Sequence, residues 1–155
     1  MILNGPNMNL LGVREPHIYG TTTLAEVEAR CRSVAAVIGA TLAFRQSNHE
    51  GELIDWIHAA RSEADAIIIN PAAFSFTSIA ILDALKTFEG PVIEVHMSNI
   101  HARDALHRHS LISGAAKAVI CGLGPFGYIA AMLSAGHLLK KLPDSLPAPL
   151  RAGLP

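Results

Sequence analysis

The run Ala66-Ile-Ile-Ile69 constrains the fold of this chain more than any other feature, because it does not alternate with polar residues. A strand with one face in water alternates apolar and polar side chains. The strands of a parallel sheet, in contrast, are covered on both faces and are continuously apolar. Pro91–Val95 has the same character. We therefore expect two central strands of a parallel sheet that carries helices on both faces.

Helical patterns separate the expected strands. Thr22 or Thr23 followed by Glu26 is a capping-box signal, which predicts a helix to about Ile38 with Gly39 beyond its end. The other expected elements are strands at Met1–Asn4, Ala40–Arg45 and Lys117–Cys121, and helices at Glu52–Ala64, Ser78–Thr87 and Tyr128–Lys140. Five strands alternating with helices predict an α/β fold: a flavodoxin-like, doubly wound, five-stranded parallel sheet in a single domain. We expect this domain to span residues 1–140, followed by a Pro- and Leu-rich tail at residues 141–155 that is loose or docked on a neighbour.

Charge and hydropathy exclude some functions. The 155 residues carry a formal net charge of −1, and half of them are hydrophobic. No basic stripe suggests a nucleic-acid partner, and no apolar run approaches the roughly 18 residues of a membrane span. Cys31 and Cys121 are expected to be buried free thiols. We expect a cytoplasmic protein without a membrane or nucleic-acid partner.

A long loop follows the first strand, and we expect residues 5–21 to form an active-site loop or lid. Loops of this length are uncommon in compact domains and are often functional. Asn7 could polarise a carbonyl, Arg14 could supply a positive charge, and Tyr19 could exchange a proton. A neighbouring cation such as Arg14 favours the phenolate form of a tyrosine. Taken alone, a loop tyrosine is more often a packing residue and a loop arginine a surface charge.

Polar side chains also follow the other expected strands, at the edge of the sheet where such folds bind ligands. Asn70 follows one strand, and Glu94, His96 and Ser98 mark the end of the next. Alternation places Glu94 and His96 on the same face, so the carboxylate can fix the tautomer of a histidine that acts as general acid or base. A lone histidine at a strand end is more often structural, but Glu94 and Asn70 beside it favour catalysis.

Two further patterns carry little functional weight. His101, His107 and His109 lie close together, but no further ligand stands at metal-like spacing, so we expect no metal site. Gly122-Leu-Gly-Pro-Phe-Gly127 matches a dinucleotide fingerprint, but no βαβ unit follows it. We expect these glycines to form a tight turn that lets the last helix approach the sheet.

The chain resembles the type II 3-dehydroquinate dehydratases from about Ile2 to Leu139. The matching stretches include Asn4-Gly-Pro-Asn-Met-Asn-Leu-Leu-Gly12, Arg45-Gln-Ser-Asn-His-Glu-Gly-Glu52, Asn70-Pro-Ala-Ala73 and Glu94-Val-His-Met-Ser-Asn-Ile-His-Ala-Arg103. The resemblance implies a flavodoxin-like subunit in a dodecamer built from trimers. It also implies a reaction without a cofactor, in which water is lost in an anti elimination through an enolate.

The resemblance also implies roles for individual residues. Tyr19 would take the proton next to the ketone, with Arg14 keeping it as phenolate, and Asn7 would hold a water that stabilises the enolate oxygen. His96 would protonate the departing hydroxyl, with Glu94 orienting it. Asn70, Ser98 and the backbone amide of Met97 would bind the substrate around its carboxylate, and Asp83 would reach into the site of a neighbouring subunit.

Three positions depart from the family pattern. Phe76 stands where the family has a histidine, Leu82 where it has an arginine, and His107 where the second arginine of His-Ala-Arg-x-x-x-Arg stands. Arg108 is one residue away and would point elsewhere on a regular backbone. In the family, these positions serve the end of the pocket that binds the ring hydroxyls or support its intersubunit contacts. We expect the three changes to remove donors or a cation there. Each lost hydrogen bond would weaken binding by about 0.5–1.5 kcal/mol.

Three hypotheses on function result. The first is dehydration of 3-dehydroquinate to 3-dehydroshikimate. The second is the same elimination on a related cyclic keto acid with fewer hydroxyls, which Phe76 and Leu82 would tolerate. The third is a non-catalytic binding or assembly protein, which would have no obvious use for Tyr19, Arg14 and His96.

Overall fold

The computed structural model describes residues 1–14 and 20–147. Within these ranges five parallel strands form one sheet, in the order β2-β1-β3-β4-β5. The strands are β1 (Ile2–Asn4), β2 (Phe44–Gln46), β3 (Ile67–Asn70), β4 (Val92–His96) and β5 (Ala118–Cys121). This topology confirms the predicted flavodoxin-like fold.

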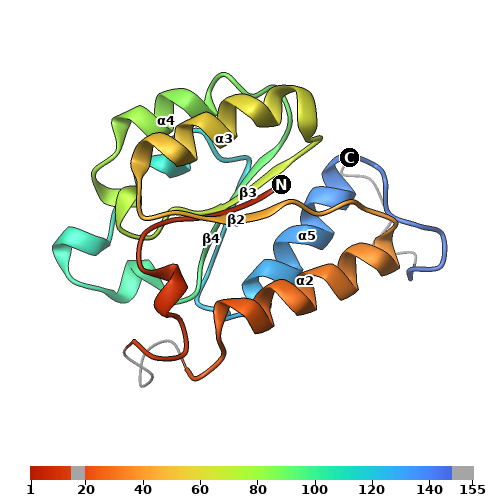
Figure 1. Cartoon of the computed structure of the whole chain (residues 1–155), viewed down its shortest axis with the longest axis horizontal. Helices are drawn as coiled ribbons and strands as arrows, with labels where there is room; N and C mark the ends of the chain where they lie inside the picture. Colours follow the sequence, from red (N-terminus) through yellow and green to blue (C-terminus); the bar gives the residue numbers. More distant parts are fainter. Residues whose placement is uncertain (15–19, 148–155) are drawn as a thin grey trace.

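Two helices cover each face of the sheet in the part of the chain that is described (Figure 1). The helices are α2 (Leu24–Ile38), α3 (Glu50–Glu63), α4 (Ile79–Leu85) and α5 (Phe126–Leu138). Helices α2 and α5 lie on one face, and α3 and α4 on the other. Ile68 packs on the α2–α5 side, whereas Ile67 and Ile69 pack on the α3–α4 side. This explains why the central run is apolar at every position.

The element boundaries follow their local signals with one clear exception. Thr23 and Glu26 form the predicted capping box, and Gly39 ends α2 in the left-handed region at φ 68°. The second strand, however, begins at Phe44 and not at Ala40. Its partner β1 is three residues long, so the residues before Phe44 have little of a neighbouring strand to pair with.

The two cysteines differ in burial. Cys31 of α2 is fully buried, as predicted, but the prediction that Cys121 is buried was wrong, because its side chain is partly exposed. Cys121 ends β5, which is an edge strand and therefore lacks a neighbour on one side.

The segments that follow β1 and β3 run side by side. The Gly5 amide donates to the carbonyl of Asn70 at 2.8 Å, and a Cβ at Gly5 would lie only 2.3 Å from the carbonyl oxygen of Pro71. Only glycine fits so close to another backbone. This close approach brings the opening segment next to the residues that follow β3. No helix among the described residues is long and apolar enough to cross a membrane.

Candidate active site

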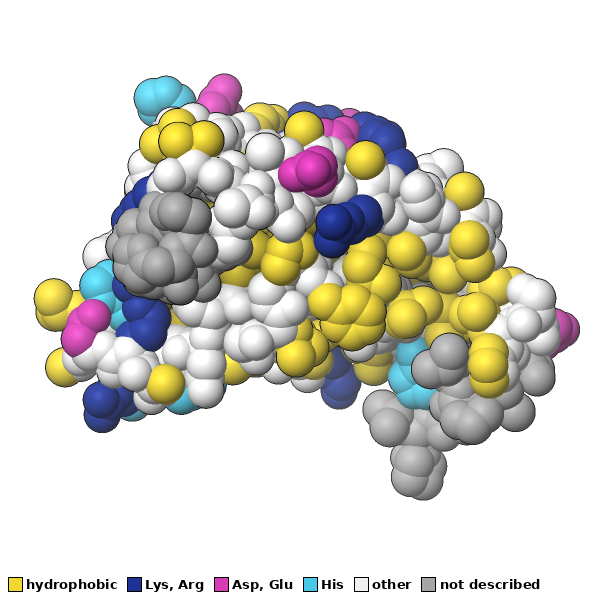
Figure 2. Space-filling model, turned by 90° about the horizontal axis from the view of Figure 1, so that it is seen from below, with side chains coloured by type: hydrophobic (Ala, Val, Ile, Leu, Met, Phe, Trp, Pro, Cys, Tyr) yellow, Lys and Arg dark blue, Asp and Glu magenta, His cyan; other side chains and the backbone are white. Residues whose placement is uncertain are grey.

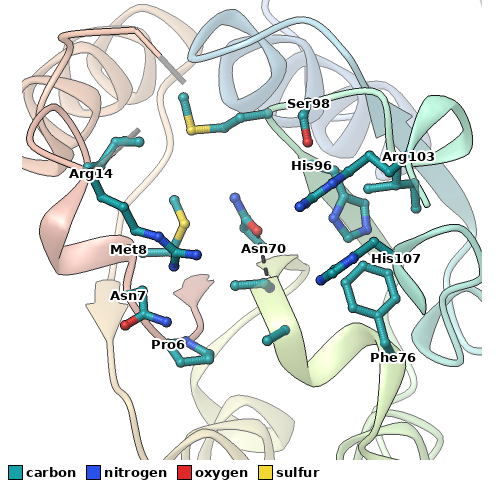
Figure 3. A pocket seen from close by; sticks show the side chains of 15 residues that line it. Pro6, Asn7, Met8, Arg14, Asn70, Phe76, His96, Ser98, Arg103 and His107 are labelled. Atoms are coloured by element: carbon teal, nitrogen blue, oxygen red, sulfur yellow. Dashed lines mark hydrogen bonds between the residues drawn. The ribbon is translucent and has the colours of Figure 1, made fainter. Parts of the chain in front are cut away.

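A cavity of about 140 Å³ lies beyond the carboxyl ends of β1, β3 and β4. Figure 3 shows the opening segment on one side, the residues after β4 together with Phe76 on the other, and Asn70 between them. The lining residues are Pro6, Asn7, Met8, Leu11, Arg14, Asn70, Ala72, Ala73, Phe76, His96, Met97, Ser98, Ile100, Arg103 and His107. The cavity therefore joins segments that are far apart in the sequence.

Most of the predicted site residues meet in this cavity. They are Asn7, Arg14, Asn70, Phe76, His96, Met97, Ser98 and His107. Glu94 lies behind His96 and contacts it directly. Tyr19 lies outside the described residues, so its predicted role stays a prediction.

Leu82, the third departure from the family pattern, does not line the cavity of its own chain. Leu82 packs with the cluster between α3, α4 and the sheet, and its Cδ1 is the atom that a Cβ at Gly114 would meet, at 3.8 Å. Helix α4 buries Ile81 and Leu85 against the sheet, and this orientation turns Leu82 away from the cavity. Asp83, on the same helix, is 65% exposed and lies 3.4 Å from Lys86, outside the cavity of its own chain.

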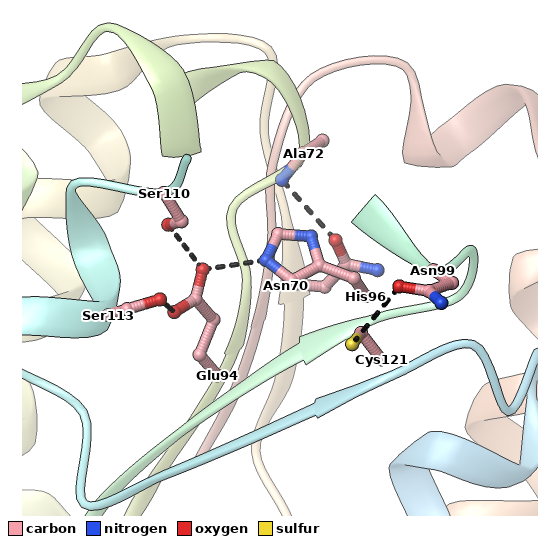
Figure 4. Close-up of polar contacts among 8 residues, drawn as sticks. All are labelled: Asn70, Ala72, Glu94, His96, Asn99, Ser110, Ser113 and Cys121. Atoms are coloured by element: carbon pink, nitrogen blue, oxygen red, sulfur yellow. Dashed lines mark hydrogen bonds and ion pairs between the residues drawn. The ribbon is translucent and has the colours of Figure 1, made fainter. Parts of the chain in front are cut away.

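His96 and Glu94 form a buried pair, as the alternation along β4 predicted. His96 Nε2 lies 2.6 Å from Glu94 Oε1, and the two side chains are 5% and 0% exposed. Two serines complete the shell of the carboxylate (Figure 4). Ser110 Oγ donates to Oε1 and Ser113 Oγ to Oε2, each at 2.5 Å. Sequence reasoning missed both serines, because irregular chain after β4 carries them back to the strand and no spacing rule indicates this return.

These hydrogen bonds keep Glu94 ionised. Burial alone would raise the pKa of the Glu94 carboxyl, but the hydrogen bonds from His96, Ser110 and Ser113 outweigh it and lower the pKa below its usual value. The ionised carboxylate can then hold one nitrogen of the His96 ring. The other nitrogen is left for proton transfer to a ligand in the cavity.

Replacing Glu94 with glutamine is expected to lower the free energy of unfolding by about 3 kcal/mol at pH 7, because it breaks a buried, hydrogen-bonded pair. The pKa of Glu94 is lowered in the folded state, so its contribution is fully present above the ordinary glutamate pKa of about 4.3. It is lost as the pH falls through the lower folded-state pKa. Urea unfolding between pH 7 and pH 3 should therefore show that the difference in the free energy of unfolding between wild type and Glu94→Gln becomes smaller on acidification.

Glu28→Gln provides a matched control, because Glu28 pairs with Arg32 at the surface of α2. Exposed pairs contribute little to stability. If the difference in the free energy of unfolding between wild type and Glu94→Gln stayed constant down to pH 3, it would contradict the proposed ionised state of Glu94.

Phe76 lies between two histidines on the far wall. Its ring centroid is 6.5 Å from that of His96, nearly parallel at 22°, and 5.2 Å from that of His107, edge to face at 84°. His107 Nδ1 lies 2.8 and 2.9 Å from the two oxygens of Asp104, and this contact lowers the pKa of the Asp104 carboxyl. The Nδ1 atom therefore carries a proton and donates to Asp104.

Arg108 does not take the place of the missing family arginine. Its Nη2 donates to the backbone carbonyl of Arg103 at 3.1 Å, and its side chain does not line the cavity. Arg103 does line the cavity, opposite Arg14 (Figure 3). The sequence analysis did not identify Arg103 as a site residue, although it ends the His-Ala-Arg stretch that resembles the family motif.

The opening segment is held in place by residues at and just after the end of β2. Asn7 adopts the left-handed conformation at φ 65°, which asparagine tolerates better than most residues. Its backbone amide donates to Asn48 Oδ1 at 2.9 Å, and Gln46 Nε2 donates to the same oxygen at 3.2 Å. These bonds position Asn7 at the cavity. Among the described residues, no three His, Cys, Asp or Glu side chains gather in a group that could hold a metal ion.

The fold and the cavity define an α/β protein with a buried histidine–carboxylate pair at the carboxyl edge of a parallel sheet. Residues 1–135 match the family described as dehydroquinase class II. The chain is 59% identical over 143 residues to the 3-dehydroquinate dehydratase of Streptomyces coelicolor, covering 88% of this chain and 91% of that one. It is 61% identical over 133 residues to the 3-dehydroquinate dehydratase of Streptomyces avermitilis, covering 85% and 84%.

A solved structure shows the same likeness. The type II dehydroquinase of Propionibacterium acnes superposes with a TM-score of 0.82 at 44% identity, covering 86% of this chain and 93% of that one. The chain belongs to the class II dehydroquinase family.

Proposed function

We propose that this protein catalyses the dehydration of 3-dehydroquinate to 3-dehydroshikimate, as a carbon–oxygen lyase. The observation that carries the proposal is the buried His96–Glu94 pair, whose histidine lines a cavity together with Asn7, Arg14 and Asn70. The names of the two Streptomyces relatives support this substrate. They give no support to a less hydroxylated ring or to a non-catalytic protein.

In the proposed elimination, residues on the two sides of the cavity have separate roles. Tyr19 would remove the proton next to the ketone, and Arg14 would favour its phenolate form. The electrons of the broken C–H bond form an enolate, whose oxygen a water held by Asn7 would stabilise. Collapse of the enolate expels the hydroxyl on the neighbouring carbon, which takes a proton from His96 and leaves as water.

The substrate carboxylate would bind near Asn70, Ser98 and the Met97 backbone amide. These residues line the cavity beside His96. An assay of the purified chain with 3-dehydroquinate tests the proposed function directly, because the conjugated enone of the product absorbs in the ultraviolet. Growth of this absorbance in proportion to enzyme concentration is the expected result, and its absence would overturn the proposal.

Restoring the two family residues in the cavity wall is expected to tighten substrate binding. The double variant Phe76→His/His107→Arg adds two polar partners for ring hydroxyls, and each hydrogen bond contributes about 0.5–1.5 kcal/mol. We expect a KM for 3-dehydroquinate that is lower by about tenfold, with a smaller change in kcat.

Leu82→Arg is the control, because Leu82 also departs from the family but does not line the cavity of its own chain. It should leave KM near the wild-type value. An unchanged KM in the double variant would show that the apolar wall costs this protein no substrate affinity.

We further propose that the chain works in the cytoplasm as a homo-oligomer, a dodecamer built from trimers in which Asp83 completes the site of a neighbour. Asp83 and Ile79 lie one turn apart on α4, and the Ile79 side chain is 64% exposed. Figure 2, viewed from the side of α2 and α5, shows a broad area of hydrophobic side chains with few charges among them. Apolar surfaces of this kind are typical of protein–protein contacts.

A further inference from the structure

A buried tyrosine hydroxyl links the floor of the cavity to the neighbouring strand. Asn70 Nδ2 donates to Tyr128 Oη at 2.9 Å, and Tyr128 Oη donates to Asn4 Oδ1 at 2.6 Å. Asn4 Nδ2 in turn donates to the backbone carbonyl of Arg45 at 3.0 Å. Asn4, Asn70 and Tyr128 are at most 3% exposed. The hydrogen bonds therefore run in one direction, from the end of β3 through α5 and β1 to β2.

This direction fixes the orientation of the Asn70 amide. Burial raises the pKa of the Tyr128 phenol, so the hydroxyl stays protonated. It donates its one hydrogen in the hydrogen bond to Asn4 Oδ1. The hydroxyl can then only accept from Asn70, which requires the nitrogen of that amide. On the other side, Asn70 Oδ1 accepts from the backbone amide of Ala72 at 3.3 Å. A flipped amide would lose both bonds.

The orientation decides what the cavity presents to a ligand. An amide nitrogen carries two hydrogens, and Tyr128 takes one of them. Asn70 lies in the middle of the cavity lining (Figure 3). The second hydrogen of Nδ2 is therefore available as a donor to an oxygen of a ligand in the cavity. A carboxylate or hydroxyl oxygen fits such a donor, and a flipped amide would present a carbonyl oxygen that repels a carboxylate.

The glycine-rich turn before α5 brings the hydroxyl within reach. Gly127 precedes Tyr128, and a Cβ at Gly127 would lie 3.3 Å from Val95 Cγ1 and 3.7 Å from Ile120 Cγ2. The first turn of α5 thus packs directly on β4 and β5. The turn is itself bound to the end of β4, since Gly122 and Gly124 donate to the carbonyls of His96 and Met97.

We propose that Tyr128 is a positioning residue for the substrate: through its hydroxyl it holds the Asn70 amide with the nitrogen toward the bound acid. This rests on the proposed function, since Asn70 is taken as a substrate-binding residue. The glycine-rich turn at residues 122–127 then serves to place this hydroxyl.

Tyr128→Phe tests the proposal, because it removes the hydroxyl and keeps the ring. We expect KM for 3-dehydroquinate to rise by about three- to tenfold, the value of one hydrogen bond, with kcat within about twofold of wild type. In an Asn70→Ala background the same change should leave KM unaltered, because the amide that it positions is gone. An equal rise of KM in both backgrounds would overturn the proposal.

Met132→Ala controls for lost stability. Met132 lies one turn after Tyr128 on α5, is 5% exposed and packs in the same core. The Met132→Ala variant should have a lower melting temperature and an unchanged KM. A rise of KM in Met132→Ala that matches the rise in Tyr128→Phe would attribute the effect to a loosened helix and would also overturn the proposal.

Crystal structures of wild type and Tyr128→Phe give a result that does not depend on turnover. The proposal expects the Asn70 amide of the variant to rotate or to occupy two orientations, with its contact to the Ala72 amide lost in one. An Asn70 side chain that is unchanged in the variant would refute the positioning role. A wild-type protein without activity on 3-dehydroquinate would instead refute the proposed function.

Discussion

Replacing His96 with glutamine is expected to lower kcat for dehydration by about 10²- to 10⁴-fold, the usual contribution of a general acid. Glutamine keeps an N–H that can donate to Glu94, so the buried carboxylate retains a partner. It cannot release a proton to the departing hydroxyl. Steady-state kinetics at saturating 3-dehydroquinate measures kcat, and thermal unfolding measures the stability of the variant. We expect a large loss of rate with a small change in melting temperature.

His101→Gln is the matched control, because His101 follows β4 closely but is exposed and lies outside the cavity. It should retain wild-type kcat and KM. If His96→Gln kept more than a tenth of the wild-type rate, protonation of the leaving group would have to come from another source, such as a water in the cavity.

Replacing Tyr19 with phenylalanine is expected to reduce kcat by a similar factor, about 10²- to 10⁴-fold, because no hydroxyl remains to take the proton next to the ketone. Exchange of that hydrogen with deuterated solvent measures the step directly and should cease in Tyr19→Phe. In His96→Gln exchange should persist, because His96 acts after the proton has been removed. These two patterns assign the base and the acid separately.

Tyr128→Phe is the natural comparison for Tyr19→Phe, since the two changes are chemically identical. The first should act on KM and the second on kcat. If Tyr128→Phe and Tyr19→Phe changed KM and kcat in the same way, this would contradict the assignment of one tyrosine to positioning and the other to catalysis.

The fold could be predicted because its strands carry strong local signals. The continuous run Ile67–Ile69 is buried on both faces of the sheet, and Thr23 with Glu26 caps α2 as expected. The start of β2 could not be predicted, because Ala40–Ala43 is apolar enough for a strand but β1 is too short to pair with it. The partial exposure of Cys121 depends on which strand lies at the edge, and local patterns do not reveal that.

The site could be predicted where its residues directly follow strands. Asn70 and His96 are of this kind, and their position at the carboxyl edge brings them together. The serines around Glu94 and the Arg103 side of the cavity lie in irregular chain, whose course depends on packing. That Leu82 does not line the cavity of its own chain could not be predicted, because a family motif shows which residue differs but not which way the helix orients it.

The Asn4–Tyr128 hydrogen bond joins residues 124 positions apart, whereas Ser110 and Ser113 lie only 16 and 19 positions from Glu94. The proton-donating side of the site is thus assembled from one short stretch of chain. The floor of the cavity requires the first strand, the third strand and the last helix together. Long loops must close before such distant contacts form. A chain that has folded as far as Ser113 can therefore hold the His96–Glu94 pair in place, but it gains an ordered binding floor only when its final helix docks.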